Sequence, residues 1–155
     1  MPVVTLESPI GPLHAIADEH CIVRFGFGPA NQTDELSTLL ERTAELTAAY
    51  FEGEEQPFDL PLAPAETPFQ EKVRAAMLAI PFGKTLTYGE ISRDIDGNPR
   101  AVGQACGLNP IPLIVPCHRV LGSGGWIGGF SGGDGVPTKH RLLAHEARTT
   151  FTLTP

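Results

Sequence analysis

The sequence predicts a mixed α/β protein in two parts, a small N-terminal α/β lobe and a mostly helical C-terminal lobe. Three short β-favouring runs fill the first 25 residues, a proline-rich stretch interrupts the chain near residue 60, and segments with helix-capping signals follow it. We therefore predict domains at residues 1–62 and 67–149. With 155 residues and 41% hydrophobic composition, the chain can build one conventional core or two small lobes that share an interface.

The N-terminal lobe is predicted from alternating β-favouring runs and one amphipathic segment. The runs are Val3–Leu6, Leu13–Ala17 and Cys21–Phe25, and turn residues separate them, which indicates a small antiparallel meander. Between residues 34 and 51 apolar side chains recur at helical spacing, so we expect a helix that covers one face of the sheet. Its stripe consists of Leu36, Leu39, Leu40, Thr43, Leu46 and Tyr50. Residues 56–65 resemble an extended linker.

The C-terminal lobe is predicted as helices with identifiable starts. Thr67-Pro68-Phe69-Gln70 combines an N-cap, a proline at the first helical position and a capping-box glutamine, so a helix should run to about residue 80. Thr87-Tyr88-Gly89-Glu90 opens a second helix, and the turn at residues 96–99 leads into a third at 100–108. A last helix should start at Val136.

A helix, a tight turn and a second helix are by themselves weak evidence for DNA binding, because such helix pairs are common. The segment 100–108 is rich in glycine and alanine and could approach a partner closely. It lacks the cluster of Arg, Asn and Gln that reads bases in the major groove.

Charge is unevenly distributed along the chain. The net charge is −7, yet residues 1–66 contain two basic and twelve acidic side chains, so the rest of the chain is weakly basic. A polyanion such as DNA would meet the C-terminal part, with modest and salt-sensitive affinity.

Neither a membrane segment nor a metal site is predicted. No run of 18 apolar residues occurs, and the N-terminus lacks the pattern of a signal peptide, so we expect a cytoplasmic protein without membrane contact. The cysteines Cys21, Cys106 and Cys117 form no CxxC motif, and no HxxxH motif accompanies them. We therefore expect no disulfide framework, no bound metal and no cofactor.

The segment Pro116-Cys117-His118-Arg119-Val120 is the strongest chemical signal in the sequence, because it fixes one thiol between a proline and two basic side chains. A free cysteine has a pKa of about 8.5 and is mostly protonated at neutral pH, so a nucleophilic cysteine needs a base or a positive field. If the segment is a strand, adjacent side chains point to opposite faces, and His118 would reach the Cys117 sulfur only through a water. A buried thiol beside a packed histidine is the simpler alternative.

A glycine-rich stretch follows at residues 121–135. It lacks the Gly-Lys-Ser/Thr ending of a phosphate-binding loop, so nucleotide binding by that route is not expected. Either the stretch is a mobile hairpin or it forms a pocket wall whose backbone faces a planar ligand.

Several blocks occur together in an order that resembles the alkylguanine-DNA alkyltransferases, also called methylated-DNA-protein-cysteine methyltransferases. The blocks are Thr67–Gln70, Tyr88–Glu90, Arg100–Gly103, Asn109-Pro110, Pro116–Val120 and Leu142–Glu146, and the match as a whole spans about residues 1 to 147. The resemblance implies a ribonuclease-H-like N-terminal lobe and a C-terminal lobe with a winged-helix-like helix-turn-helix. It also implies a monomer that binds alkylated double-stranded DNA and transfers an alkyl group from the 6-oxygen of guanine to a cysteine, once per molecule.

The resemblance also assigns roles to residues. Cys117 would accept the alkyl group, while Glu146, His118 and a water would remove the thiol proton. Tyr88 would push at the DNA backbone or donate a proton to the leaving guanine, and Asn109 would brace the site. DNA binding would involve Arg100, which fills the gap left by the flipped base, together with Ala101, Gly103 and Tyr88. The substrate pocket would consist of Tyr88, Arg119, Val120, Ser131 and Gly132.

One departure from the family pattern is a short interval between Tyr88 and Arg100, which predicts a late start of the second helix of the pair.

Three alternative functions stay open. The chain could be a noncatalytic relative that binds alkylated DNA, although such relatives lack the acceptor cysteine. It could be a Cys-His hydrolase, which needs an adjacent base and an oxyanion hole. It could also be a helix-turn-helix regulator.

Overall fold

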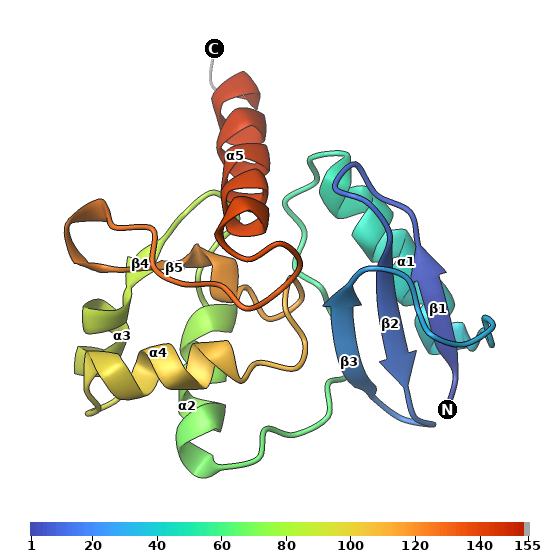
Figure 1. Cartoon of the computed structure of the whole chain (residues 1–155), viewed down its shortest axis with the longest axis horizontal. Coiled ribbons are helices and arrows are strands. Elements are labelled where there is room, and N and C mark those ends of the chain that lie inside the picture. Colours follow the sequence, from blue (N-terminus) through green and yellow to red (C-terminus); the bar gives the residue numbers. More distant parts are fainter. Residues whose placement is uncertain (154–155) are drawn as a thin grey trace. The chain divides into compact units, whose positions relative to one another are not determined.

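The structure is a computed structural model that describes residues 1–153, with side chains as far as residue 147. The chain divides into two compact units, residues 1–63 and residues 64–155. A sheet with one helix forms the first unit, and the second is mostly helical (Figure 1). The mixed α/β class predicted from the sequence is thus confirmed.

The first unit is built on a three-stranded antiparallel sheet in the order β1-β2-β3. The strands are β1 (Val3–Leu6), β2 (Leu13–Ala17) and β3 (Ile22–Phe27). The side chain of Asp18 accepts hydrogen bonds from the backbone amides of His20 and Cys21, both at 2.7 Å, and so shapes the turn before β3. That turn includes Cys21, which is why β3 begins one residue later than predicted.

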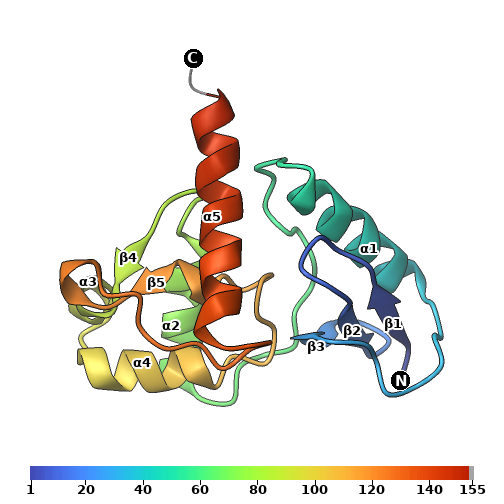
Figure 2. The same ribbon diagram turned by 45° about the horizontal axis from the view of Figure 1, so that its top comes forward.

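Helix α1 (Thr38–Phe51) packs on one side of this sheet (Figure 2). Ser37 caps it by accepting a hydrogen bond from the amide of Leu40 at 3.2 Å. The predicted start at residue 34 is wrong, because Glu35 instead exchanges two backbone hydrogen bonds with Val3. Leu36, which we expected on the apolar stripe, is 55% exposed.

Residues 56–65 are extended, as expected, but they are not a free linker. The amide of Ile22 donates to the carbonyl of Pro61, and the amide of Ala63 donates to the carbonyl of Ile22, both at 2.8 Å. Leu60 is buried. The segment therefore adds a short strand-like edge to the first unit before the chain enters the second.

In the second unit, α2 (Pro68–Leu78) is capped by Thr67, whose hydroxyl accepts from the amide of Gln70 at 3.1 Å. The predicted capping box is only half formed, since Gln70 Oε1 has no hydrogen-bond partner among the described residues. Helix α3 (Tyr88–Asp94) has both halves, with Thr87 and Glu90 bonded reciprocally at 3.0 Å.

Helix α4 (Pro99–Gly107) starts at an Asn98 cap and packs against α3 and α2. The turn between α3 and α4 contains Asp96 at φ 58°, a left-handed conformation that Asp tolerates better than most residues. Arg100 is the second residue of its helix, so the predicted late start of this helix is wrong. The strands β4 (Leu86–Thr87) and β5 (Val120–Leu121) pair in parallel beside this helix pair.

Two 3-10 turns and a long helix complete the second unit. They are η1 (Cys117–Arg119), η2 (Ser123–Gly125) and α5 (Val136–Leu153). Helix α5 packs on η1, which brings the C-terminal part of the chain onto the Pro-Cys-His-Arg-Val segment.

Candidate active site

Cys117 is the first residue of the short helix η1. The strand-like geometry considered for this segment is wrong, because the amide of Val120 donates to the Cys117 carbonyl and closes a helical turn. A 3-10 helix has three residues per turn, so neighbouring side chains point roughly 120° apart. Cys117 and His118 consequently face different surroundings.

The Cys117 side chain lines a pocket of about 480 Å³. One wall comes from α4 and the start of α3, and the other comes from the glycine-rich segment after β5. The lining residues are Tyr88, Gly103, Cys106, Gly107, Cys117, Trp126, Gly129, Phe130 and Ser131. Ser131 Oγ donates to the Gly107 carbonyl at 3.3 Å and joins the two walls. Because Cys117 is only 8% exposed, the pocket is the route by which a substrate reaches its sulfur.

One glycine of this wall is required by close packing. Gly128 has φ 77°, and a Cβ atom at that position would lie 2.9 Å from Tyr88 Oη. Any larger residue would displace Tyr88 from the pocket.

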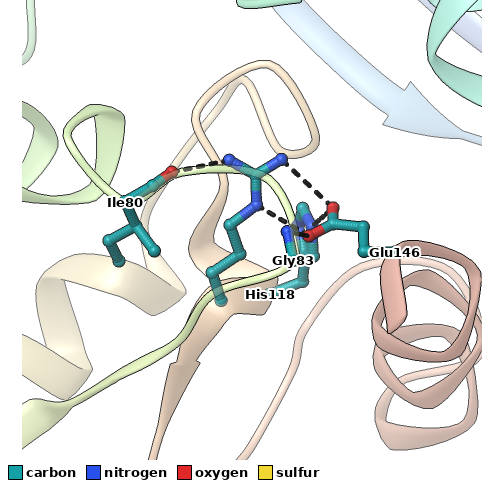
Figure 3. A network of polar contacts seen from close by, with 5 residues as sticks. Ile80, Gly83, His118 and Glu146 are labelled. Carbon is teal, nitrogen blue, oxygen red and sulfur yellow. Dashed lines mark hydrogen bonds and ion pairs between the residues drawn. The ribbon is translucent and has the colours of Figure 1, made fainter. Parts of the chain in front are cut away.

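Glu146, on α5, is the centre of a buried polar network (Figure 3). Its Oε2 lies 2.6 Å from His118 Nε2, and it accepts from Arg119 through Nε at 2.9 Å and Nη2 at 3.1 Å. The amide of Gly83 donates to Oε1 at 3.2 Å, and Arg119 Nη1 donates to the Ile80 carbonyl at 2.8 Å. The side chains of His118 and Glu146 are 0% and 1% exposed, so this network is shielded from water.

The protonation states of this pair follow from its surroundings. Burial acts to raise the pKa of Glu146, but the hydrogen bonds and charges of His118 and Arg119 outweigh burial and lower that pKa to about 2. The carboxylate is therefore ionised and can only accept, so His118 Nε2 carries the proton. Burial lowers the pKa of His118, and Glu146 opposes this only in part. The imidazole is thus neutral at pH 7, with its lone pair on Nδ1.

His118 Nδ1 is buried and has no hydrogen-bond partner among the residues that the structure describes. A buried nitrogen with a free lone pair is costly unless a solvent molecule or a substrate group uses it. His118 is therefore a candidate base that directly follows Cys117 in the sequence.

The Cys117 thiol needs such a base. Burial raises the pKa of Cys117, while a hydrogen bond from Asn109, the charge of Lys139 and nearby backbone amides oppose the rise. The sulfur is consequently protonated at neutral pH and a weak nucleophile until the proton leaves.

Asn109 fixes the loop between α4 and Cys117. Its Oδ1 accepts from the amide of Ile111 at 3.0 Å, and its Nδ2 donates to the Val115 carbonyl at 2.9 Å. Within this loop the buried Leu113 has φ 73°, which is uncommon for a residue other than glycine. The side chain of Asn109 thus holds a strained turn directly before the thiol.

Lys139, on α5, belongs to the site and was missed in the sequence. It is fully buried, and its Nζ donates to the Val120 carbonyl at 2.6 Å and to the Gly129 carbonyl at 3.2 Å. The same nitrogen lies 5.8 Å from the centre of the Tyr88 ring. Burial lowers the pKa of Lys139, while the Cys117 and Cys106 thiols act to raise it. A signal was present, because positions 139, 142 and 146 share one helix face, and a charge on a buried face indicates a partner.

Tyr88 begins α3 and is half-buried, and burial raises its pKa to about 12. It is therefore a phenol, able to donate a proton, at neutral pH.

The other predicted residues lie in three settings. Arg100 is exposed on the first turn of α4, beside Ala101, whose amide donates to the Asn98 cap at 2.9 Å. Arg119 and Val120 are engaged by Glu146 and Lys139, so they support the pocket from behind. Gly132 lies next to the lining residue Ser131, and its carbonyl accepts from the amide of Gly135 at 2.8 Å.

Among the described residues, no group of three or more His, Cys, Asp or Glu side chains could hold a metal ion. Cys21, Cys106 and Cys117 are free thiols. None of the helices in the described part of the chain is both long and apolar enough to span a membrane.

Comparison with known proteins identifies relatives of both units. Residues 3–64 match the family model described as 6-O-methylguanine DNA methyltransferase, ribonuclease-like domain, and residues 68–148 match the DNA binding domain of the same family. A Methanosarcina acetivorans protein named methylated-DNA-protein-cysteine methyltransferase is 42% identical over 150 residues, which cover 90% of this chain and 94% of that protein. A Mycolicibacterium paratuberculosis protein of the same name is 46% identical over 154 residues, covering 93% and 91%.

Solved structures agree with these matches. The crystal structure of Mycobacterium tuberculosis OGT in complex with DNA has a TM-score of 0.84 and 36% identity to this chain, and covers 96% of this chain and 94% of that one. A Methanococcus jannaschii O6-methylguanine DNA methyltransferase has a TM-score of 0.67 and 28% identity, with 93% of each chain covered.

Proposed function

The chain belongs to the 6-O-methylguanine DNA methyltransferase family, and on that premise we propose that it repairs DNA by moving an alkyl group from the 6-oxygen of guanine to Cys117. The observation that carries the proposal is a poorly exposed thiol that opens onto a pocket, next to a neutral histidine with a free Nδ1. That histidine is held by an ionised carboxylate.

The transfer begins with the thiol proton. It passes through a solvent water to His118 Nδ1, while Glu146 stabilises the imidazolium that forms. The Cys117 thiolate then attacks the alkyl carbon, so that a carbon–sulfur bond forms as the bond between that carbon and the guanine oxygen breaks. The electron pair of the broken bond stays on the guanine, and the phenol of Tyr88 supplies the proton that completes the neutral base. Through solvent, the phenolate then regains a proton equivalent to the one that His118 took from the thiol, so that both side chains return to their neutral forms.

The reaction is stoichiometric. A thioether carbon has no good leaving group, so the new carbon–sulfur bond is not hydrolysed. Each molecule therefore repairs one lesion.

The target carbon is buried inside duplex DNA, so the guanine must leave the base stack. Flipping costs a few kcal/mol and costs least where pairing is already weakened by damage. Helix α4, with Gly103 lining the pocket and Arg100 and Ala101 on its first turn, is rich in small residues and suits close approach to the minor groove. We assign Arg100 to the space that the flipped base leaves, and α3, α4 and the β4-β5 pair to a winged-helix-like DNA-binding unit.

We further propose that the protein acts as a monomer in the cytoplasm, in keeping with its three free thiols. A noncatalytic DNA-binding role is not favoured, since the acceptor cysteine is present and is supported by a base. A Cys-His hydrolase is not favoured either, because the relatives that match over most of the chain are methyltransferases.

The test is the intact mass of the protein after incubation with a duplex that carries one O6-methylguanine. We expect one methyl group per molecule, located on Cys117, and none in Cys117→Ala. Cys21→Ala, which removes a free thiol of the first unit, is the matched control and should accept one methyl group. An adduct on Cys21 or Cys106, or more than one equivalent of repaired DNA per protein, would disprove the assignment.

A further inference from the structure

Trp126 is an exposed aromatic side chain at the pocket that contains Cys117. It is the only tryptophan in the sequence, it is 65% exposed, and it lines the pocket together with Tyr88 and Phe130. A tryptophan so exposed has a large apolar surface that the fold itself leaves uncovered.

The indole is held in place from below. A Cβ atom on Gly122 would lie 2.2 Å from the Trp126 ring, so the ring packs directly on the backbone of that glycine. The backbone turn is closed by two hydrogen bonds, from the amide of Gly122 to the Trp126 carbonyl at 2.6 Å and from the amide of Trp126 to the Ser123 carbonyl at 3.3 Å. Trp126 therefore lies on a closed turn, and its indole packs against the backbone of Gly122.

The opposite wall of the pocket offers little side-chain surface. From α4 it consists of Gly103, Cys106 and Gly107, none of which has a flat apolar face. Aromatic contact with a planar ligand must come from Tyr88, Phe130 and Trp126, and of these Trp126 is the largest.

We propose that Trp126 is a binding residue for the extruded alkylguanine nucleotide, and that its indole covers the outer part of the base once the base has entered the pocket. The inference rests on the proposed function and adds a residue to it that the sequence did not indicate. Stacking of an aromatic side chain on a base changes affinity by about five- to 150-fold when the aromatic is replaced by alanine. Because the indole is already held against Gly122, Trp126 loses little side-chain freedom on binding, and we expect an effect of about tenfold.

The experiment uses the full chain carrying Cys117→Ala, so that the complex does not react. Two duplexes that differ only in one O6-methylguanine are titrated against it, and the emission of Trp126 is followed. Because no other tryptophan contributes, a change reports this side chain alone. We expect the lesion duplex to quench the emission strongly and the undamaged duplex to leave it nearly unchanged.

Affinity is then measured for Trp126→Ala and Trp126→Phe in the same background. Alanine should weaken binding of the lesion duplex by about tenfold and barely affect the undamaged duplex, while phenylalanine should restore most of the loss. Leu108→Ala is the matched control, because Leu108 is 66% exposed in the same unit but does not line this pocket. It should leave the ratio of the two affinities unchanged.

The outcomes separate the inference from the function on which it rests. Equal emission with both duplexes, or equal weakening in Trp126→Ala and Leu108→Ala, would overturn the role of Trp126. If the protein with Cys117 intact also accepts no methyl group, the proposed function fails instead.

Discussion

Replacing Glu146 by Gln tests the network behind Cys117. Glutamine keeps the size of the side chain and removes its charge, so Arg119, whose side chain is 11% exposed, loses its buried counter-ion. The pKa of Glu146 falls from its ordinary value of 4.5 to about 2 in the folded protein, which corresponds to about 3 kcal/mol of stability. Breaking a buried ion pair from one side costs a similar amount, about 3–5 kcal/mol. We therefore expect the melting temperature to fall by about 6–12 °C.

The same change alters the chemistry. The amide group of glutamine can donate to His118 Nε2, which would shift the imidazole proton to Nδ1 and remove the proposed base. Loss of a general base slows a reaction by about 10²–10⁴-fold, so transfer at pH 7 should be at least about 100-fold slower. Since the raised pKa of Cys117 then limits the thiolate fraction, the variant rate should rise about tenfold per pH unit as pH increases.

The assay is single-turnover transfer followed by intact mass, at a temperature well below both melting points. Glu71→Gln is the matched control, because Glu71 pairs with Arg74 at 3.7 Å but is 52% exposed. Its stability should change by less than about 1 kcal/mol and its rate should not change.

The pH dependence of the free energy of unfolding is a second test of the role of Glu146. A carboxyl group with a lowered pKa in the folded state stabilises the protein above its unfolded pKa and loses that effect as pH falls. The difference in stability between the wild-type protein and Glu146→Gln should therefore narrow between pH 4.5 and about 2. A variant that melts normally and transfers methyl groups at the wild-type rate at every pH would refute the relay.

Two further predictions concern DNA and the thiol. Arg100→Ala should slow repair within duplex DNA more than transfer from a free alkylated guanine base, because its proposed role is to hold the flipped state; equal slowing of both substrates would place Arg100 in the pocket or in folding. Lys139→Met should raise the pKa of Cys117 and slow transfer by about tenfold, which is the effect of roughly one pKa unit. The pKa is measured from the pH dependence of the alkylation of Cys117 by a small thiol reagent. An unchanged alkylation profile would show that Lys139 only supports the Val120 and Gly129 carbonyls.

Local capping chemistry made most of the second unit predictable. The Thr87–Glu90 box forms as expected, and Thr67 caps its helix, because these contacts join residues three apart in the sequence. The start of α1 was wrong because its competitor is remote. Glu35 pairs with Val3, which lies 32 residues earlier, and helical spacing alone does not reveal such pairing.

The site could be predicted only as far as family motifs reach. The helix face that Lys139 shares with Leu142 and Glu146 indicates a partner for its charge, but the partners are two backbone carbonyls, which no sequence motif identifies. The role of Trp126 depends on Gly122, four residues earlier, whose importance is visible only when the ring is seen to pack on its backbone.

The face of α5 explains how one helix can favour proton transfer. Glu146 and Lys139 lie two turns apart on α5, with the buried Leu142 between them, and they bond neighbouring parts of the segment after Cys117: Glu146 bonds His118 and Arg119, and Lys139 bonds the Val120 carbonyl. Moving the thiol proton to His118 creates a negative sulfur and a positive imidazole inside the protein, which would be costly without counter-charges. Glu146 contacts the imidazole, and the charge of Lys139 acts to lower the pKa of Cys117, so each new charge of the proposed transfer is opposed by a charge of opposite sign. Both side chains project from a single helix and are already hydrogen-bonded in the free chain, so in the proposed mechanism they are held in place before DNA binds.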